Sequence, residues 1–316
     1  MKRSTSNDAR SPYIWVALSI VYVLWGSTYL GIHFVVQTMP PLLSGGIRFL
    51  CAAVVLGGVL VLRSGPGVLR VPWPRLGIAT VVGLLLLTGG NGMVSVAELH
   101  ISTGLAALLV ASVPLWLVLF RWLTGDRPPP ATLAGVLVGF GGLALLTLTR
   151  GGGSGSMFGV VVILFAALSW AIGSFLSSRL PMPANPFTAS VYEMAAGGLA
   201  LLAIGFAQGE TVDVDRISRT SWLALAYLIV FGSLVAFTSY VWLLGNAPIS
   251  LVGTYAYVNP TVAVLLGVVF AGETATWTIL LGGLIIIAGV GMVVSTERRP
   301  RPRSAPEPQP HEHVPA

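Results

Sequence analysis

The sequence predicts an all-α integral membrane protein in which ten transmembrane helices form two five-helix inverted-topology repeats around a central cavity. Three observations lead to this fold class. Only 9% of the 316 residues are charged, against about 25% in an ordinary soluble domain, and the mean hydropathy is +0.86. Apolar stretches long enough to cross a bilayer follow one another along nearly the whole chain. The second half of the chain also repeats features of the first half.

The second observation is the series of apolar stretches. About 20 apolar residues are needed to cross the hydrocarbon core of a bilayer. Ten such stretches are predicted: Tyr13–Val35, Leu43–Leu62, Leu76–Ala97, Thr103–Leu123, Ala131–Thr149, Met157–Ser177, Phe187–Ala207, Ser221–Leu243, Ser250–Ala271 and Thr276–Ser295. Short connections rich in Pro and Gly separate them. This pattern excludes a cytosolic enzyme, a nucleic-acid-binding protein and a disordered chain.

The basic residues predict the orientation, because loops that remain in the cytoplasm carry an excess of Lys and Arg. With a cytoplasmic N-terminus, thirteen basic residues lie inside: Lys2, Arg3, Arg10, Arg63, Arg70, Arg75, Arg121, Arg127, Arg179, Arg298, Arg299, Arg301 and Arg303. Three lie outside: Arg150, Arg216 and Arg219. We therefore expect a multi-pass protein of the inner or plasma membrane with both termini in the cytoplasm, since ten crossings return the chain to the side on which it started.

Matching residues recur at a spacing of 145 to 147: Trp25 and Trp170, Pro41 and Pro186, Arg48 and Glu193, Pro114 and Pro260, and Gly125 and Gly272. So small a drift indicates a duplication, and a unit of five crossings must insert in the opposite orientation when it is copied. The predicted organisation is a cytoplasmic segment (1–12), a first repeat (13–149), a Gly/Ser linker (150–156), a second repeat (157–295) and a disordered cytoplasmic tail (296–316).

Several kinds of chemistry are excluded by composition. The single lysine, Lys2, lies before the first apolar stretch, so neither a nucleotide-binding P-loop nor a Schiff-base lysine is present within the fold. The one cysteine, Cys51, allows no intrachain disulfide and no thiolate metal cage. We expect no cofactor, no metal and no catalytic residues, so that any uphill transport would draw on a gradient.

Several short segments resemble a known family. They are Trp25–Tyr29 (WGSTY), Gly46–Phe49, Gly89–Gly92, Val96–Glu98, Gly104–Ala111 before Pro114, and Tyr255–Pro260 (YAYVNP) with Gly272–Thr274. Together they resemble the EamA family of the drug/metabolite transporter superfamily, in particular its YedA-like exporter subgroup, with two repeats at about residues 14–149 and 158–295. The resemblance implies an inner-membrane exporter of small metabolites or drugs, without fixing the substrate.

Two charged residues fall inside predicted spans, where an ionisable group costs several kcal/mol unless it is paired or hydrated. Arg48 and Glu193 each lie seven residues after a matched proline, Pro41 or Pro186. At a rise of about 1.5 Å per residue, each charge would lie about 10 Å below its own face of the membrane, and the two faces are opposite. In a hydrocarbon core about 30 Å thick, the two charges would then lie about 10 Å apart along the membrane normal. Two interpretations remain open: charges that only stabilise the bundle, or a cavity in which Arg48 attracts an anionic group and Glu193 accepts a proton or a cationic group.

Other residues are candidates for binding or gating. Glu98 ends the third span and has either a solvated or interfacial role or a role in substrate exit or gating. Asn91 lies in a Gly-rich segment that favours local unwinding at Gly90, and supplies either a substrate contact or an ordinary interhelical hydrogen bond. Pro114 and Pro260 lie at matched positions and are hinge candidates, the alternative being static kinks.

Aromatic residues deep in the spans form the last group. Tyr needs a hydrogen-bond partner in lipid, so these side chains either face a cavity or pack in the core. The remaining substrate-binding or coupling candidates are Trp25, Tyr29, Trp170, Tyr240, Tyr255, Tyr257 and Asn259.

The leading hypothesis for function is a secondary active transporter, an exporter of small metabolites, amino-acid-like compounds or drugs that works by alternating access. The alternatives are an integral membrane enzyme and a passive channel or structural subunit, although no metalloprotease or serine-hydrolase motif and no filter loop is found. The expected partners are the lipid bilayer, a small-molecule substrate and a proton as coupling ion. No nucleic acid is expected, and homo-oligomerisation is left open.

Overall fold

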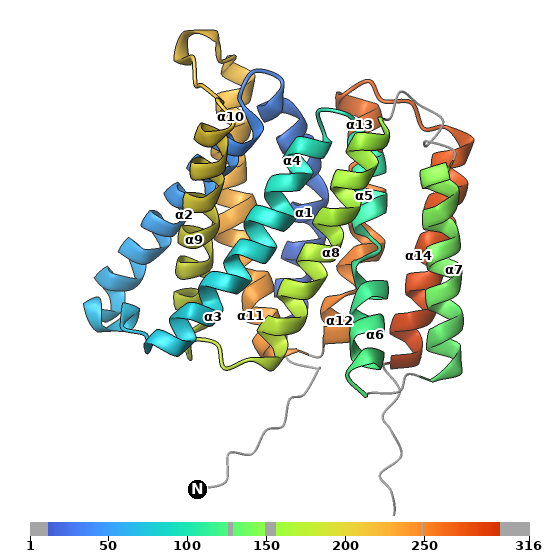
Figure 1. Cartoon of the computed structure of the whole chain (residues 1–316), viewed down its shortest axis with the longest axis horizontal. Helices are drawn as coiled ribbons and strands as arrows, with labels where there is room; N and C mark the ends of the chain where they lie inside the picture. Colours follow the sequence, from blue (N-terminus) through green and yellow to red (C-terminus); the bar gives the residue numbers. More distant parts are fainter. Residues whose placement is uncertain (1–11, 126–128, 149–155, 248, 298–316) are drawn as a thin grey trace, which may run out of the picture.

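The computed structural model describes residues 12–125, 129–148, 156–247 and 249–297 (Figure 1). Every element in these ranges is a helix. The first half contains α1 (Pro12–Val36), α2 (Pro41–Ser64), η1 (Pro66–Leu69), α3 (Trp73–Gly83), η2 (Leu84–Gly92), α4 (Met93–Ala97), α5 (Thr103–Val110), α6 (Val113–Leu123) and α7 (Pro130–Leu148). The second half contains α8 (Met157–Arg179), α9 (Pro186–Ala207), η4 (Val214–Arg216), α10 (Arg219–Tyr227), η5 (Leu228–Phe237), α11 (Thr238–Asn246), α12 (Ile249–Val252), α13 (Tyr255–Phe270) and α14 (Trp277–Glu297).

In the part of the chain that the structure describes, seven helical segments are long and apolar enough to cross a membrane: 12–36, 41–64, 73–97, 103–123, 157–179, 186–207 and 219–246. Three further apolar helices within the described ranges are shorter, at 130–142, 258–270 and 277–293. The all-helical membrane class predicted from the sequence is therefore confirmed. Most of the predicted Gly/Ser linker (150–156), N-terminal segment (1–12) and tail (296–316) lies outside the described residues.

Four helical stretches of the chain are not regular α-helices from end to end. The stretch 103–123 is interrupted between α5 and α6, directly before Pro114, and the stretch 249–270 is interrupted between α12 and α13. The stretches 73–97 and 219–246 each contain a π-helix, η2 or η5. The two π-helices begin 144 residues apart. Single-turn π segments are frequent at functional sites. Here each half of the chain contains a longer π-helix, and the two π-helices lie in corresponding spans.

Helices from the two halves pack against one another in matched pairs. The most extensive contacts are α7 with α14 and α2 with α9, which lie toward opposite ends of the view in Figure 1. Between them, α1 contacts η5 and α13, while α8 contacts η2 and the pair α5 and α6. The contacts of α1 with η5 and α13 thus have counterparts, with the halves exchanged, in those of α8 with η2 and with α5 and α6.

Turns after four helices also come in matched pairs. Gly65, Gly125, Gly209 and Gly272 follow α2, α6, α9 and α13, and each has a positive φ, between 66° and 90°. Only glycine adopts this conformation without strain, which explains why glycine ends these helices. Two of the glycines are followed by a carboxylate that caps a helix of the other half. Glu210 accepts hydrogen bonds from the backbone N–H groups of Leu42 and Leu43, at 3.2 and 2.8 Å.

The second cap has stronger contacts. Glu273 accepts hydrogen bonds from the backbone N–H and the hydroxyl of Thr103, both at 2.6 Å, and from the N–H of Gly104 at 3.2 Å. A carboxylate at a helix N-terminus satisfies free N–H groups and interacts favourably with the helix dipole. The two glutamates therefore tie the start of α2 and of α5 to the opposite half.

The contact between α7 and α14 depends on glycine. A Cβ placed on Gly135 would lie 2.8 Å from the carbonyl oxygen of Gly289, and one placed on Gly289 would lie 2.6 Å from the Cα of Gly139. The structure places the contact within one chain.

We predict that Gly289→Ala lowers the thermal stability of the purified protein by the equivalent of about 1–3 kcal/mol, because the new methyl group meets backbone atoms that cannot move away. The control is Gly141→Ala on α7, since nothing lies within 4 Å of a Cβ there. Thermal unfolding monitored by tryptophan fluorescence compares the two variants. Equal melting temperatures would contradict the glycine-dependent contact.

Candidate functional site

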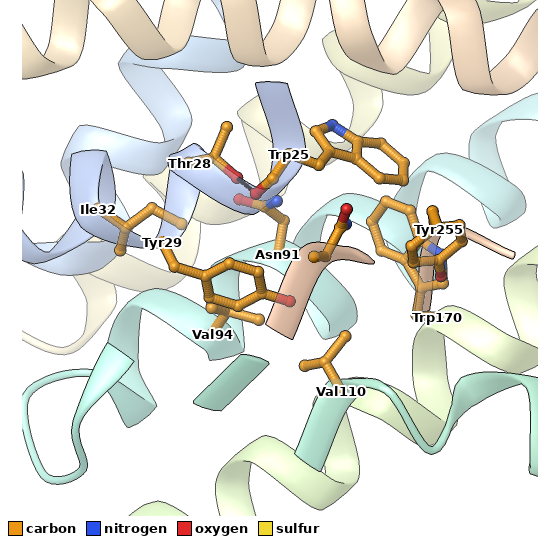
Figure 2. Close-up of a pocket in the computed structure, with 10 residues that line it drawn as sticks. Trp25, Thr28, Tyr29, Ile32, Asn91, Val94, Val110, Trp170 and Tyr255 are labelled. Atoms are coloured by element: carbon orange, nitrogen blue, oxygen red, sulfur yellow. Dashed lines mark hydrogen bonds between the residues drawn. The ribbon is translucent and has the colours of Figure 1, made fainter. Parts of the chain in front are cut away.

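A pocket between the two halves contains about 440 Å³ of space not filled by atoms. Its lining comes from α1, η2, α4 and α5 of the first half and from α8 and α13 of the second half (Figure 2): Trp25, Thr28, Tyr29, Ile32, Asn91, Val94, Val110, Trp170, Tyr255 and Asn259. Six of these residues, Trp25, Tyr29, Asn91, Trp170, Tyr255 and Asn259, are sequence-predicted candidates. The pocket combines aromatic faces with amide and hydroxyl groups.

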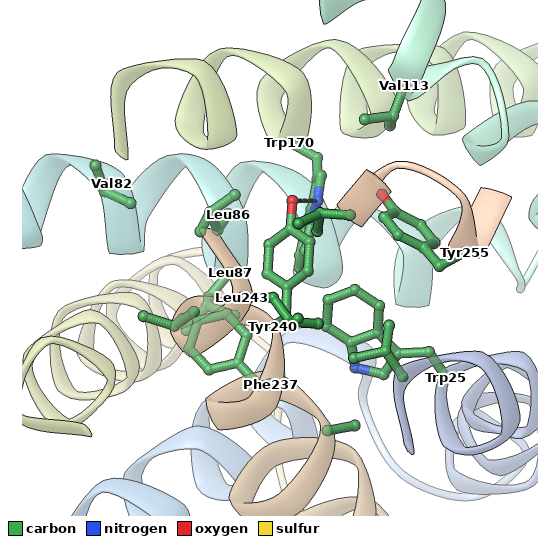
Figure 3. Packing of buried hydrophobic residues seen from close by; sticks show 14 of the residues in the cluster. Trp25, Val82, Leu86, Leu87, Val113, Trp170, Phe237, Tyr240, Leu243 and Tyr255 are labelled. Carbon is green, nitrogen blue, oxygen red and sulfur yellow. Dashed lines mark hydrogen bonds between the residues drawn. The ribbon is translucent and has the colours of Figure 1, made fainter. Parts of the chain in front are cut away.

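An aromatic cluster is defined here as Trp25, Trp170, Tyr240 and Tyr255; three of its members line this pocket, and Tyr240 packs behind them. Trp25 packs edge-on against Trp170 and Tyr255, with ring centroids 5.3 and 5.5 Å apart, and Tyr240 lies 4.7 Å from Trp25 (Figure 3). Trp25 and Trp170, which occupy matched positions of the two halves, are therefore in direct contact.

Hydrogen bonds fix the orientation of this cluster. The Trp170 indole N–H donates to the Tyr240 hydroxyl at 3.2 Å, and that hydroxyl shares a 2.7 Å hydrogen bond with Ser174. The Trp25 indole N–H is directed at the carbonyl oxygen of Gly232 in η5, at 3.4 Å. Each buried indole or phenol group named here thus has a polar partner, which holds the rings in one arrangement.

Arg48 lies behind the pocket wall rather than in it. Its side chain is 3% exposed and donates from Nε to the Ser233 hydroxyl at 2.9 Å and from Nη1 to the Asn91 amide oxygen at 3.1 Å. Because the oxygen of Asn91 accepts from Arg48, the amide NH₂ group of Asn91 is the one left for a solute. Arg48 therefore connects α2 to both π-helices and positions Asn91.

Glu193 is fully buried on α9, and neither carboxylate oxygen has a hydrogen-bond partner among the described residues. A Cβ placed on Gly83 of α3 would lie 2.5 Å from the Glu193 Cα, so the two helices touch at this point. Arg48 and Glu193 form no ion pair in the described structure, and neither lines the pocket. Burial without a partner disfavours the charged carboxylate.

Glu98 differs from one sequence-based interpretation. With 6% of its surface exposed, Glu98 is buried rather than solvated, whereas an interfacial role or a role in substrate exit or gating stays a prediction. Its carboxylate has no hydrogen-bond partner among the described residues, and Tyr29 and Glu273 interact with it electrostatically. Glu98 lies one turn beyond Val94, which lines the pocket. The chain shields this position because α4 packs against α8.

The remaining candidates occupy varied positions. Gly90 lies in η2, where the Gly-rich segment forms a π-helix instead of unwinding. Pro114 is the second residue of α6, after the interruption, whereas Pro260 lies inside α13. The backbone of Tyr257 belongs to α13, and its side chain lies outside the described residues.

Sequence reasoning missed four lining residues, Thr28, Ile32, Val94 and Val110. A signal for two of them was available, since Ile32 follows Thr28 by four residues and Val94 follows Asn91 by three, which places each on the same helix face as a polar neighbour. Apolar residues with this spacing are common in any helix core, so the signal has little specificity.

We predict that Arg48→Met destabilises the protein by about 1–3 kcal/mol, because the Ser233 hydroxyl and the Asn91 oxygen lose a buried donor. Arg63→Met, which removes an exposed arginine of the same helix, is the matched control. Thermal unfolding of both variants is the measurement. Loss of stability in both to the same extent would show that Arg48 has no such connecting role.

The fold and the pocket define a multi-pass helical membrane protein with a pocket lined by both halves of the chain. The model of the EamA-like transporter family matches residues 11–148 and again residues 157–295. The chain therefore belongs to the EamA-like transporter family, which confirms the resemblance seen in the sequence. The two matched segments each supply part of the pocket lining.

Similar proteins bear transporter names. The chain is 39% identical over 278 residues to the "Uncharacterized inner membrane transporter YedA" of Escherichia coli strain K12, covering 87% of this chain and 88% of that protein. It is 26% identical over 286 residues to the "Uncharacterized transporter YvbV" of Bacillus subtilis, covering 87% and 90%. A crystal structure of another protein, 23% identical, matches with a TM-score of 0.66 over 90% of this chain and 98% of that one. This last likeness concerns the fold.

Proposed function

We propose that the protein is a secondary active transporter that exports small metabolites, amino-acid-like compounds or drugs by alternating access. The observation that carries this proposal is the pocket between the two matched segments, in which Trp25 and Trp170 meet at matched positions. A site built from both halves is exposed to one side or the other when the halves exchange conformations. The transporter names of the relatives agree with this function class.

The architecture that we propose for this function is ten crossings in two inverted five-helix repeats, at 13–149 and 157–295. The reciprocal helix contacts support it, as do the paired positive-φ glycines and the π-helices that begin 144 residues apart. The shorter helices 130–142, 258–270 and 277–293 would complete the count, because α7 continues to Leu148, α14 continues to Glu297, and α12 precedes α13. A matched π-helix in each repeat would let the third and eighth spans change register together.

We further propose that both termini lie in the cytoplasm and that the protein resides in the inner or plasma membrane. The distribution of basic residues supports this orientation. The location is supported by the similarity to YedA, which is named as an inner membrane transporter.

In this proposal the pocket residues bind the solute directly. The indole rings of Trp25 and Trp170 offer apolar faces, while the Asn91 amide N–H groups donate hydrogen bonds. The side-chain oxygen of Asn259 is buried without a hydrogen-bond partner among the described residues, and it would accept one from the solute. A small molecule with an apolar or aromatic body and a polar end fits these groups. Tyr29, Tyr240 and Tyr255 would shape the site, and Glu193 or Glu98 would exchange a proton.

The first test is an unbiased comparison of excreted metabolites in cells with and without overexpressed protein. We predict altered export of one chemical class, and its reduction by at least about 10-fold in Trp25→Ala, which removes a ring from the pocket wall. Trp15→Ala is the control, since Trp15 lies on the same helix and is 48% exposed. Unchanged excretion together with altered lipid chemistry would instead favour a membrane enzyme.

The second test concerns coupling. We predict that Glu193→Gln abolishes efflux driven by a proton gradient in vesicles while leaving membrane insertion intact, because glutamine keeps the shape of the side chain but cannot exchange a proton. Solute movement without a pH gradient serves as the control for the pocket itself. Wild-type pH-driven transport in this variant would refute the role of Glu193.

A further inference from the structure

A second cavity lies at one end of the bundle, away from the pocket between the halves. It contains about 570 Å³ of space not filled by atoms and is bounded by η1, the η1–α3 connection and the start of α9. In Figure 1, η1 connects the lower ends of α2 and α3. A hydrogen bond from the Thr188 hydroxyl to the carbonyl oxygen of Val68, at 3.1 Å, joins η1 to α9. The cavity walls are thus fixed by contacts between separate elements.

The charge of this cavity is positive. Arg70 and Arg75 both line it, and no carboxylate is among its lining residues. Neither arginine forms an ion pair with any residue that the structure describes. The N-terminus of the 22-residue helix α9 borders the cavity through Asn185 and Thr188, but the Asn185 side chain already accepts from the Phe187 N–H at 2.9 Å and Pro186 has no N–H to offer. The donors left for an anion are therefore the two guanidinium groups, which suit the oxygens of a phosphate group.

The surroundings of the cavity indicate the source of that phosphate. Trp73, adjacent to the lining residue Pro72, is 84% exposed, as expected of a tryptophan at the headgroup level of a bilayer. Phe187, which lies between the lining residues Asn185 and Thr188 in the sequence, is also open to the outside, with 40% of its surface exposed. These surfaces suit acyl chains, whereas a soluble phosphate would make no use of them.

We propose that this cavity binds the phosphate group of an anionic phospholipid, with Arg70 and Arg75 as its ligands. Basic pockets between helices at a membrane surface are suited to lipid head groups, and each arginine near the surface contributes to binding. The proposal does not depend on the transported solute, because the cavity shares no lining residue with the pocket between the halves.

The test is native mass spectrometry of the purified full chain titrated with phosphatidylglycerol or with phosphatidylcholine of the same acyl chains. We expect the wild type to prefer phosphatidylglycerol, and R70Q/R75Q to bind it about 30-fold more weakly. The charge-matched control is R63Q/R179Q, which removes two exposed arginines outside the cavity and should retain the preference. R70K/R75K keeps the charge and should retain part of it.

Three outcomes would overturn the proposal. The first is equal binding of the two lipids by the wild type. The second is an equal loss of phosphatidylglycerol in R70Q/R75Q and R63Q/R179Q, which would indicate general surface charge. The third is displacement of phosphatidylglycerol by millimolar inorganic phosphate, which would identify a site for the free anion. Thermal unfolding of each variant confirms that the cavity residues are compared in folded protein.

Discussion

The close approach of α2 and α9 is the contact on which the rest of the structure depends. A Cβ placed on Gly46 would lie 3.0 Å from the Gly198 carbonyl oxygen, and one placed on Gly198 would lie 3.1 Å from the Gly46 carbonyl oxygen. Lipid tails are as apolar as the helix surfaces, so helices in a membrane associate through close packing and polar contacts rather than through the hydrophobic effect. Reciprocal glycine contacts of this kind bring the two halves together and thereby determine where the pocket can exist.

Burying a polar group inside such a bundle costs free energy unless the group is paired, and the buried charged residues differ in whether they have partners. Arg48 makes two hydrogen bonds, to Ser233 and Asn91, whereas Glu193 and Glu98 have no hydrogen-bond partner among the described residues. Paired groups hold the wall of the pocket, and under the proposed function the unpaired carboxylates would be the ones to exchange a proton. This division is consistent with a protein in which some groups hold the shape of the site and others change their state.

The sequence predicted much of the site because a duplication leaves a measurable spacing. Trp25 and Trp170 were matched by a separation of 145 residues, and their rings are in contact in the structure. Asn91 was selected because it lies in a Gly-rich segment, and Tyr255 because a Tyr hydroxyl deep in a span needs a partner; both line the pocket, as does Asn259 of the YAYVNP segment. The all-helical membrane class followed from hydropathy alone.

Other features depend on information that hydropathy does not contain. The π-helices η2 and η5 differ from α-helices in the register of their backbone hydrogen bonds. An apolar run such as Leu84–Leu87 does not determine which register forms. The caps formed by Glu210 and Glu273 join residues about 170 positions apart, at separations that only the tertiary structure fixes. Glu98 is buried because α4 packs against α8, so its position at the end of a span gave the wrong degree of exposure.

The most direct test of the account asks whether the pocket is reached from both sides of the membrane. Val110 lines the pocket, and a Val110→Cys variant with Cys51→Ser presents one thiol there. A membrane-impermeant thiol reagent is then applied to right-side-out and to inverted vesicles, with Val293→Cys, whose residue is 2% exposed in the native structure, as a buried control. The account predicts labelling of the pocket thiol in both preparations. Labelling from one side only would contradict alternating access to this pocket.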